Sequence, residues 1–379
     1  MHQSTRGALL IFLLLQITHS SPDLHGDNVG AANPLTDYVA FLPENFSLPT
    51  FYSEEERELL QGTSLADAVE QKLRSLENEF DLLRTSTEEI HWCKKHWWDE
   101  KTGHLTIDDW KRVDAMFRSR ALELPGTGDA MVPCVDMANH ASGTKTVAVY
   151  ETTERKNAVL QLRQGKRLKQ GEEITITYGD EKGVSEMIFS YGFVESGVAN
   201  ARQLFLDLDI PTDDPLRLAK KAVCKDAPGV RLYTKENGEI GWESKYVWWS
   251  CVNEEDGLGF RILQANDGGK ELKMLWKKVE LETERLEETL TSDSMRDIFQ
   301  LRAVVILQRR IERQASELEE TEEQFSEGVR LPGVRPTTWE TIKKLRALEV
   351  EFLADAYQSM QAEVCPIPFS AISGIMTNA

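Results

Sequence analysis

The spacing of apolar residues changes twice along this chain of 379 residues. Residues 65–83 carry one apolar stripe at steps of three and four, which predicts an amphipathic helix. From Met131 to about residue 178 apolar residues alternate with polar ones, which is typical of strands. Beyond about residue 200 the helical spacing returns. The two changes predict an α+β protein whose strands lie between two helical regions.

The first 20 residues fit two interpretations. Arg6 precedes an apolar run at residues 8–15, which is the outline of a secretory signal peptide, and a glycosylation sequon at Asn45 would suit secretion. The alternative is a buried helix over residues 8–17, which we favour because of motifs further along the chain. The run is far too short for a membrane span, which takes about 20 residues.

Local signals predict further elements before residue 200. Ser53 with Glu56, and Thr106 with Asp109, have the spacing of capping boxes at helix starts. The second helix has a face formed by Trp110, Val113, Phe117 and Arg120. Strands are predicted at 132–135, 146–151, 157–163 and 172–178, the middle two as a hairpin, and a short helix at 185–190.

Three apolar stripes in the C-terminal half predict three long amphipathic helices. Their members are Leu272, Trp276, Val279, Leu286 and Leu290; then Ile298, Leu301, Val305, Ile311, Ala315 and Leu318; then Trp339, Ile342, Leu345, Phe352 and Ala356. We therefore expect residues 200–379 to form an all-α domain, separate from a first domain at residues 1–199.

The charge balance is strongly acidic, because 63 Asp and Glu residues outnumber 44 Lys and Arg residues to leave a net charge of −19. A protein that grips nucleic acid or an anionic membrane needs a surplus of cations on some face, so we expect neither partner. A basic protein partner fits this charge, and we expect a monomer. The five cysteines are few and widely spaced, which favours reduced thiols and a cytoplasmic or nuclear location, with secretion as the alternative.

The motifs of several common enzyme classes are absent from the sequence. It contains no nucleophile elbow, no phosphate-binding loop and no Gly-x-Gly-x-x-Gly fingerprint. His91, Cys93, His96 and His104 cluster, but a second thiolate and the paired spacing of zinc sites are missing. We therefore predict no metal site.

Polar residues stand at several positions where the local period expects apolar ones. Arg120 continues the buried face of its helix, and a buried guanidinium requires a nearby anion. Asn139 and His140 follow an apolar strand, where they either cap a turn or serve a site. Tyr178 shares the inward face of its strand with Ile174 and Ile176, so its hydroxyl must find a partner.

Taken in order, these stretches resemble the C-terminal half of a SET domain of the Rubisco large-subunit methyltransferase type, a family of protein-lysine N-methyltransferases. The matching residues are 119–121, 132–140, 171–179, 185–186 and 191–195. The helices at about 35–118 resemble the family's insertion within the SET domain. Residues from about 200 resemble its helical substrate-binding domain. The resemblance implies an α+β fold of small sheets with a pseudoknot, followed by helices.

The resemblance also implies the chemistry and the site. The cofactor would be S-adenosyl-L-methionine, bound by Asn139 and His140 in the pseudoknot and by Arg120 at its carboxylate. Tyr178 would be the catalytic tyrosine, and Tyr191 and Phe193 would complete the pocket around the acceptor nitrogen. The reaction would transfer a methyl group to a protein lysine, of a non-histone or ribosomal type of protein, by in-line displacement.

One part of the family's pattern is missing. The family begins with a strand segment carrying a Gly-x-Gly motif, whereas residues 8–17 and 35–43 here resemble the helix and the Leu-Pro stretch that follow it. We expect the first domain to lack those opening strands, through a late start of the gene model, natural shortening or an acquired signal-like start. The alternative to an enzyme is a catalytically inactive SET-derived scaffold that binds protein partners.

Overall fold

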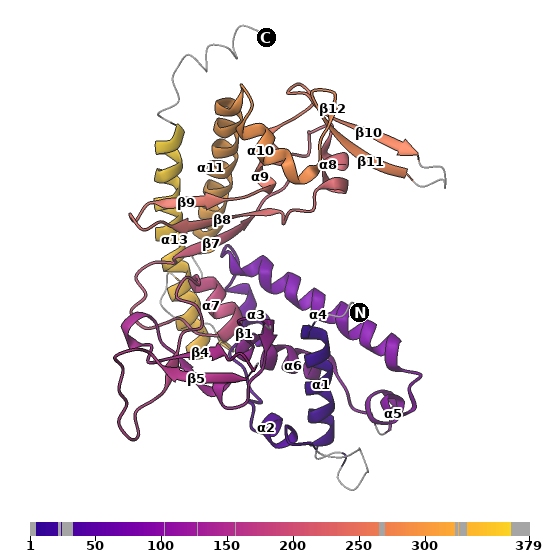
Figure 1. The fold of residues 1–379 in the computed structure, drawn as a ribbon, viewed down its shortest axis with the longest axis vertical. Coiled ribbons are helices and arrows are strands. Elements are labelled where there is room, and N and C mark those ends of the chain that lie inside the picture. The colour runs from indigo at the N-terminus through magenta and orange to yellow at the C-terminus, as the bar shows by residue number, and fades with distance from the viewer. Residues whose placement is uncertain are drawn as a thin grey trace. The chain divides into compact units, whose positions relative to one another are not determined.

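The computed structural model describes residues 5–21, 24, 33–101, 103–126, 128–155, 157–264, 270–322, 325 and 332–364 (Figure 1). The chain divides into two compact units. The first contains Met1–Glu58, Leu65–Val198 and Leu331–Thr341, and the second contains Leu59–Ser64, Ala199–Arg330 and Ile342–Ala379. The main boundary lies one residue from the division predicted at 199 and 200, but two short segments belong to the other unit, which no local signal in the sequence indicates.

Helices form one core of the first unit. Helix α1 (Thr5–His19) buries Leu10, Leu13 and Leu14, so residues 8–17 do form the buried helix that we favoured. They pack with α2 (Thr36–Ala40), α4 (Leu65–Thr87) and α6 (Ile107–Arg120). Full burial of a leucine side chain is worth about 1.5–3 kcal/mol, so α1 contributes substantially to this core.

Both predicted capping boxes are present. Before α3 (Glu54–Glu58), the Ser53 amide donates to the Glu56 carboxylate at 3.1 Å and the Glu56 amide donates to Ser53 Oγ at 3.2 Å. At the start of α6, the Thr106 amide donates to Asp109 Oδ2 at 2.8 Å. These bonds satisfy amides that a helix start otherwise leaves without partners.

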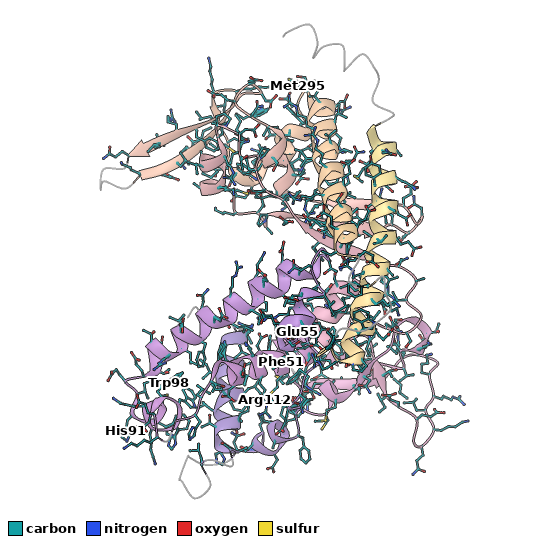
Figure 2. The ribbon with its side chains drawn as sticks, turned by 180° about the vertical axis from the view of Figure 1, so that it is seen from behind. Phe51, Glu55, His91, Trp98, Arg112 and Met295 are labelled. Atoms are coloured by element: carbon teal, nitrogen blue, oxygen red, sulfur yellow. The ribbon has the colours of Figure 1, made fainter. Side chains whose placement is uncertain are left out.

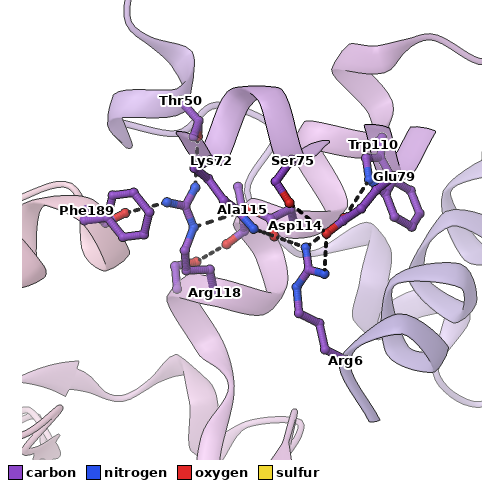
Figure 3. A network of polar contacts seen from close by, with 11 residues as sticks. Arg6, Thr50, Lys72, Ser75, Glu79, Trp110, Asp114, Ala115, Arg118 and Phe189 are labelled. Atoms are coloured by element: carbon purple, nitrogen blue, oxygen red, sulfur yellow. Dashed lines mark hydrogen bonds and ion pairs between the residues drawn. The ribbon is translucent and has the colours of Figure 1, made fainter. Parts of the chain in front are cut away.

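A buried ionic cluster joins three helices of this unit (Figure 3). Asp114 of α6 is 0% exposed and contacts Arg6 of α1 at 2.7 Å, Lys72 of α4 at 2.8 Å and Arg118 at 3.4 Å. Burial alone would raise the pKa of the Asp114 carboxyl, but the charges of Arg118 and Lys72 outweigh it and lower the pKa. Asp114 therefore stays ionised at neutral pH.

Small sheets follow α6. They are the antiparallel pair β1 (Leu122–Leu124) and β2 (Gly128–Ala130), the parallel pair β3 (Asn139–His140) and β6 (Thr175–Ile176), and the antiparallel hairpin β4 (Ala148–Thr152) and β5 (Ala158–Leu162). Their core contains Leu122, Leu124, Ala138, Ala148 and Ile176. Helix α7 (Val184–Tyr191) follows these sheets in the chain, where the sequence predicts a short helix at residues 185–190.

Two predicted strands are corrected. Residues 132–135 are not a strand, because Cys134 has φ +73° and the amides of Val135 and Asp136 both donate hydrogen bonds to the Val132 carbonyl, as in a turn. The strand predicted at 172–178 shortens to Thr175–Ile176, since only these residues pair with β3. The alternating pattern therefore predicted more strand residues than the structure contains, because a strand also needs a hydrogen-bonded partner along its length.

The second unit is not all-α, which corrects our expectation. It contains two antiparallel sheets, β7 (Gln203–Asp207), β8 (Gly229–Thr234) and β9 (Ile240–Glu243), and β10 (Leu258–Gln264), β11 (Lys270–Trp276) and β12 (Val279–Glu280). Its helices are α8 (Arg217–Val223), α9 (Tyr246–Cys251), α10 (Leu286–Thr291), α11 (Arg296–Glu320) and α13 (Pro336–Val364), the last of which begins in the first unit.

The three predicted helical stripes meet different outcomes. The first fails, because Leu272 and Trp276 lie in β11, where they pair with Ile262 and Leu258 of β10. The second lies on α11, but the buried face includes Phe299, Val304 and Leu307 in place of the predicted Leu301 and Val305. The third is confirmed, since its five residues on α13 are all buried.

Three members of the cysteine and histidine cluster, His91, Cys93 and His96, lie in a short helical segment after α4, and His104 lies in the loop before α6. Figure 2 labels the ends of the helical segment, His91 and Trp98, and the Trp98 indole donates to Thr87 Oγ1 at 3.0 Å. The residues that the structure describes contain no group of three or more His, Cys, Asp or Glu side chains arranged to hold a metal ion. Within the same residues, no helix has the length and apolar character needed to cross a membrane.

Candidate functional site

Tyr178 is positioned by the short parallel pairing of two distant segments. Asn139 and His140 of β3 lie opposite Thr175 and Ile176 of β6, and the Ala141 amide extends the pairing to the Ile176 carbonyl at 2.9 Å. Two residues beyond β6, the Tyr178 hydroxyl donates to the Ala138 carbonyl at 2.9 Å. This is the inward partner that the sequence required. Burial raises the pKa of Tyr178, which keeps the hydroxyl protonated.

Tyr191 and Phe193 are delivered by the end of helix α7. The helix ends at Gly192, which has φ +80°. No larger residue fits there, because a Cβ would lie 2.8 Å from the Ser47 carbonyl. Glycine ends helices in this left-handed conformation readily. The chain therefore turns sharply between the two aromatic residues.

Four rings gather around this turn. The ring centroids of Tyr178 and Tyr191 are 4.5 Å apart, and those of His140 and Tyr178 are 5.2 Å apart. Phe193 lies 6.1 Å from His140 and 6.4 Å from Tyr191. These separations are typical of interacting aromatic pairs. Burial also raises the pKa of Tyr191, so the cluster presents neutral hydroxyls.

Arg120 lies at the C-terminal end of α6, where a cation is favoured by the helix dipole. Its guanidinium donates to the Asp136 carbonyl at 3.1 Å, while its Nε has no hydrogen-bond partner among the described residues. The Asp136 carboxylate is buried and accepts a short hydrogen bond from the Tyr38 hydroxyl. Burial raises the pKa of the nearby Asp136 carboxyl overall, although the charge of Arg120 acts to lower it, and the guanidinium bonds the Asp136 carbonyl. Neither Asp136 nor Tyr38 was selected from the sequence, since no local pattern links residues 98 positions apart.

A cavity of about 570 Å³ connects several of these residues. Arg120, Tyr178 and Tyr191 line it, together with Asp136 and the buried ionic cluster of Arg6, Lys72, Asp114 and Arg118. Small-molecule sites in proteins generally have volumes of about 300–1,000 Å³. The cavity can therefore hold a nucleoside-sized ligand.

The other three predicted site residues do not line this cavity. Asn139 is exposed, and its side-chain amide donates to Glu173 Oε1 at 2.5 Å. The side chain of His140 is only 2% exposed and its Nδ1 accepts a hydrogen bond from the Tyr178 amide at 3.0 Å. Phe193 contacts the rings of His140 and Tyr191. Their contact with a cofactor stays a prediction.

Two carboxylates that the sequence analysis did not select lie on the cavity wall. Glu123 of β1 and Asp129 of β2 are directly opposite in the antiparallel pair, both are exposed and both line the cavity. Like charges in opposite positions destabilise a sheet. The negative charge of Glu123 helps to raise the pKa of Tyr150. A negative charge on Tyr150 would in turn raise the pKa of Tyr191. The acidic pair therefore shares the cavity wall with Tyr150, Tyr178 and Tyr191.

The residues present fit S-adenosyl-L-methionine. Arg120 offers an unsatisfied guanidinium nitrogen to a carboxylate, and a buried donor without a partner is unfavourable until a ligand supplies one. The buried Asp136 Oδ1 likewise lacks a partner among the described residues and can accept a hydrogen bond. The aromatic rings can contact a cationic centre, and the Lys182 ammonium lies 6.0 Å from the centroid of the Tyr191 ring.

Comparison with known proteins places these observations in a family context. No protein-family model matches the chain. Over 279 residues it is 28% identical to SET domain-containing protein 8 of Schizosaccharomyces pombe, a match that covers 73% of this chain and 62% of that protein. Over 184 residues it is 30% identical to the [fructose-bisphosphate aldolase]-lysine N-methyltransferase of Arabidopsis thaliana, covering 47% and 37% respectively. The chain thus spans less than two thirds of these relatives.

The fold has a solved counterpart. The structure of Rubisco LSMT bound to AdoMet superimposes with a TM-score of 0.63 at 17% identity, covering 96% of this chain and 76% of that one. The predicted fold class, α+β with a SET domain, is confirmed. The resemblance to SET-domain proteins of this type is likewise confirmed by sequence and by fold.

Proposed function

We propose that this chain, which has the SET-domain fold of the Rubisco large-subunit methyltransferase type, is an S-adenosyl-L-methionine-dependent protein-lysine N-methyltransferase. One observation carries the proposal: Arg120, Tyr178 and Tyr191, matched by motif from segments far apart in sequence, line one cavity. The lysine methyltransferase named among the relatives and the AdoMet-bound structural neighbour support it.

Arg120 would hold the cofactor through its free guanidinium nitrogen, with the ring faces of Tyr178 and Tyr191 beside the reacting centre. When bound, S-adenosyl-L-methionine supplies a methyl group on a cationic sulfur to the acceptor nitrogen. The half-buried rings would limit access of water, which lowers the pKa of an entering lysine amine and favours its reactive neutral form. The fixed hydroxyl of Tyr178 restricts how the amine can be oriented, and positioning of this kind supplies most of the rate in such a transfer.

The direct test uses the full chain with labelled S-adenosyl-L-methionine and a set of lysine-containing proteins. Tyr178→Phe removes the hydroxyl and keeps the ring, so we expect methyl transfer to fall about 100-fold while calorimetry shows unchanged cofactor binding. Tyr233→Phe, a tyrosine of the second unit, is the control. Cofactor binding without labelling of any protein, together with an inert Tyr178→Phe, would favour a non-catalytic scaffold.

The acidic pair of Glu123 and Asp129 supports a basic protein as the substrate. No cation in the described part of the chain pairs with either carboxylate, so their charge is available at the cavity wall. A lysine or arginine that flanks the acceptor lysine would relieve their mutual repulsion. The net charge of −19 acts in the same direction by steering basic proteins towards the chain.

Two peptides separate this substrate preference from the activity itself. One carries arginine beside the acceptor lysine and the other carries alanine there. The double variant Glu123→Gln/Asp129→Asn should raise KM for the arginine peptide about 10-fold, with kcat and the alanine peptide unaffected. Equal KM values for both peptides in the unsubstituted protein would reject the preference without touching the proposed activity.

We further propose a cytoplasmic or nuclear location. Helix α1 supplies Leu10, Leu13 and Leu14 to the core and Arg6 to the ionic cluster, so cleavage near residue 20 would remove part of the folded unit. The four described cysteines are free thiols, which suits a reducing compartment. N-terminal sequencing of the protein from cells tests this, because a start near Ser21 and sugar on Asn45 would show secretion.

A further inference from the structure

The contacts of His140 favour one of the two neutral tautomers of its imidazole ring. Its Nδ1 accepts the hydrogen bond from the Tyr178 amide at 3.0 Å, so Nδ1 carries no proton. A neutral imidazole has one N–H, which must then lie on Nε2. With the side chain only 2% exposed, water cannot readily replace these contacts.

The Nε2 of His140 faces a carboxylate. It has no hydrogen-bond partner among the described residues, but Glu195 Oε2 lies 3.7 Å away. The other carboxylate oxygen of Glu195 accepts a short hydrogen bond from Ser142 Oγ, and the side chain is 16% exposed. Ser142 follows β3, and Glu195 follows the turn after α7. The carboxylate is therefore anchored where it attracts a proton on Nε2.

We propose that Glu195 is a positioning residue that acts on Tyr178 through His140. The carboxylate favours the Nε2–H form of the imidazole, which leaves Nδ1 free to accept from the Tyr178 amide. The bond at Nδ1 and the ring contact at 5.2 Å then hold Tyr178 where its hydroxyl meets Ala138. The inference rests on the proposed function only for its effect on turnover.

The physical consequence of losing Glu195 follows from the two ring nitrogens. A proton that moves to Nδ1 would face the Tyr178 N–H, and two donors directed at each other repel. The backbone after β6 would then shift, and the ring of Tyr178 with it. A displacement of about 1 Å at a positioned group can reduce turnover about 100-fold.

The first readout needs no activity. With ¹⁵N-labelled histidine in the full chain, nuclear magnetic resonance should show the neutral Nε2–H form of His140. Glu195→Gln keeps the size of the side chain and removes its charge, so the Nδ1–H form should increase. Ser142→Ala should change the signal in the same direction by less. Glu181→Gln, an exposed carboxylate nearby in the sequence, is the matched control.

The second readout is kinetic. Glu195→Gln should lower kcat about 10- to 100-fold and leave KM for S-adenosyl-L-methionine within about twofold, because the residue acts on Tyr178 and not on cofactor binding. Circular dichroism confirms that the variant is folded. An Nδ1–H imidazole in the unsubstituted protein, or an unchanged ring signal in Glu195→Gln, would overturn the proposal. If no substrate is ever methylated, the ring signals still decide it.

Discussion

Among the described residues, each unit has one carboxyl group with no exposed surface, and the pKa values of these two groups shift in opposite directions. Asp114 in the first unit and Glu349 in the second are both 0% exposed. Asp114 lies among Arg6, Lys72 and Arg118, which lower its pKa (Figure 3). Glu349 instead accepts hydrogen bonds from the amide and the hydroxyl of Ser64.

The difference shows that burial by itself does not determine whether a carboxylate is charged. Burial raises the pKa of Glu349 to about 7, against the opposing effects of Ser64 and of the Arg346 charge. Around Asp114 three cations outweigh the same burial effect. Two neutral hydrogen-bond donors therefore do not keep the pKa of a fully buried carboxyl group low, whereas three nearby cations do.

The largest expected effect comes from removing the charge of Asp114. Asp114→Asn removes the anion shared by three half-buried cations, of which Arg6 also pairs with Glu79, and loss of one partner from a buried ionic group costs about 3–5 kcal/mol. The measurement is urea unfolding combined with hydrogen exchange of the α6 amides. Asp108→Asn on the same helix, where the side chain is 79% exposed, should change the free energy of unfolding by less than about 0.5 kcal/mol.

The pH dependence should separate the two carboxylates. Because the folded-state pKa of Glu349 is raised from 4.5 to about 7, the folded protein binds this proton more tightly than the unfolded chain does. Stability from this group is present below pH 4.5 and decreases as pH rises through 7. Asp114 has the opposite sign, since its lowered pKa makes stability decrease as pH falls below about 4.

Glu349→Gln tests this directly. The neutral amide should stabilise the second unit by about 1–3 kcal/mol at pH 8 and have little effect at pH 5, measured by hydrogen exchange of the α13 amides. Glu351→Gln, an exposed position on the same helix, is the control. A variant that destabilises equally at both pH values would show that Glu349 is ionised when buried, like Asp114.

The smallest effect is expected at one cation of the cluster. Lys72→Met keeps the length of the side chain and leaves Arg6 and Arg118 to balance Asp114, so we expect a loss of about 1 kcal/mol. Burial lowers the pKa of Lys72, so its charge is less favourable there than in water. A loss as large as that of Asp114→Asn would mean that all three cations are required.

Local sequence patterns determined the elements whose stabilising contacts are local or repeat along one face. The capping boxes at Ser53 and Thr106, the stripe of α4 and the stripe of α13 depend on neighbours three or four residues away, so the spacing alone predicts them. The hairpin β4–β5 formed as predicted because its two strands follow each other in the sequence with only a short turn between them. The inward hydroxyl of Tyr178 followed from alternation, although the partner, Ala138, did not.

The tertiary structure decided whatever depends on residues far apart in the chain. Leu272 and Trp276 are four residues apart, which fits a helix, but with Met274 between them they also fit the two-residue period of a strand. Pairing with β10 selected the strand. No pattern in the sequence links Asp114 to Arg6, Tyr38 to Asp136 or Glu195 to His140. Charge states and orientations at the site come from these distant contacts, because burial and the nearest charges set a pKa and neither is a property of the local sequence.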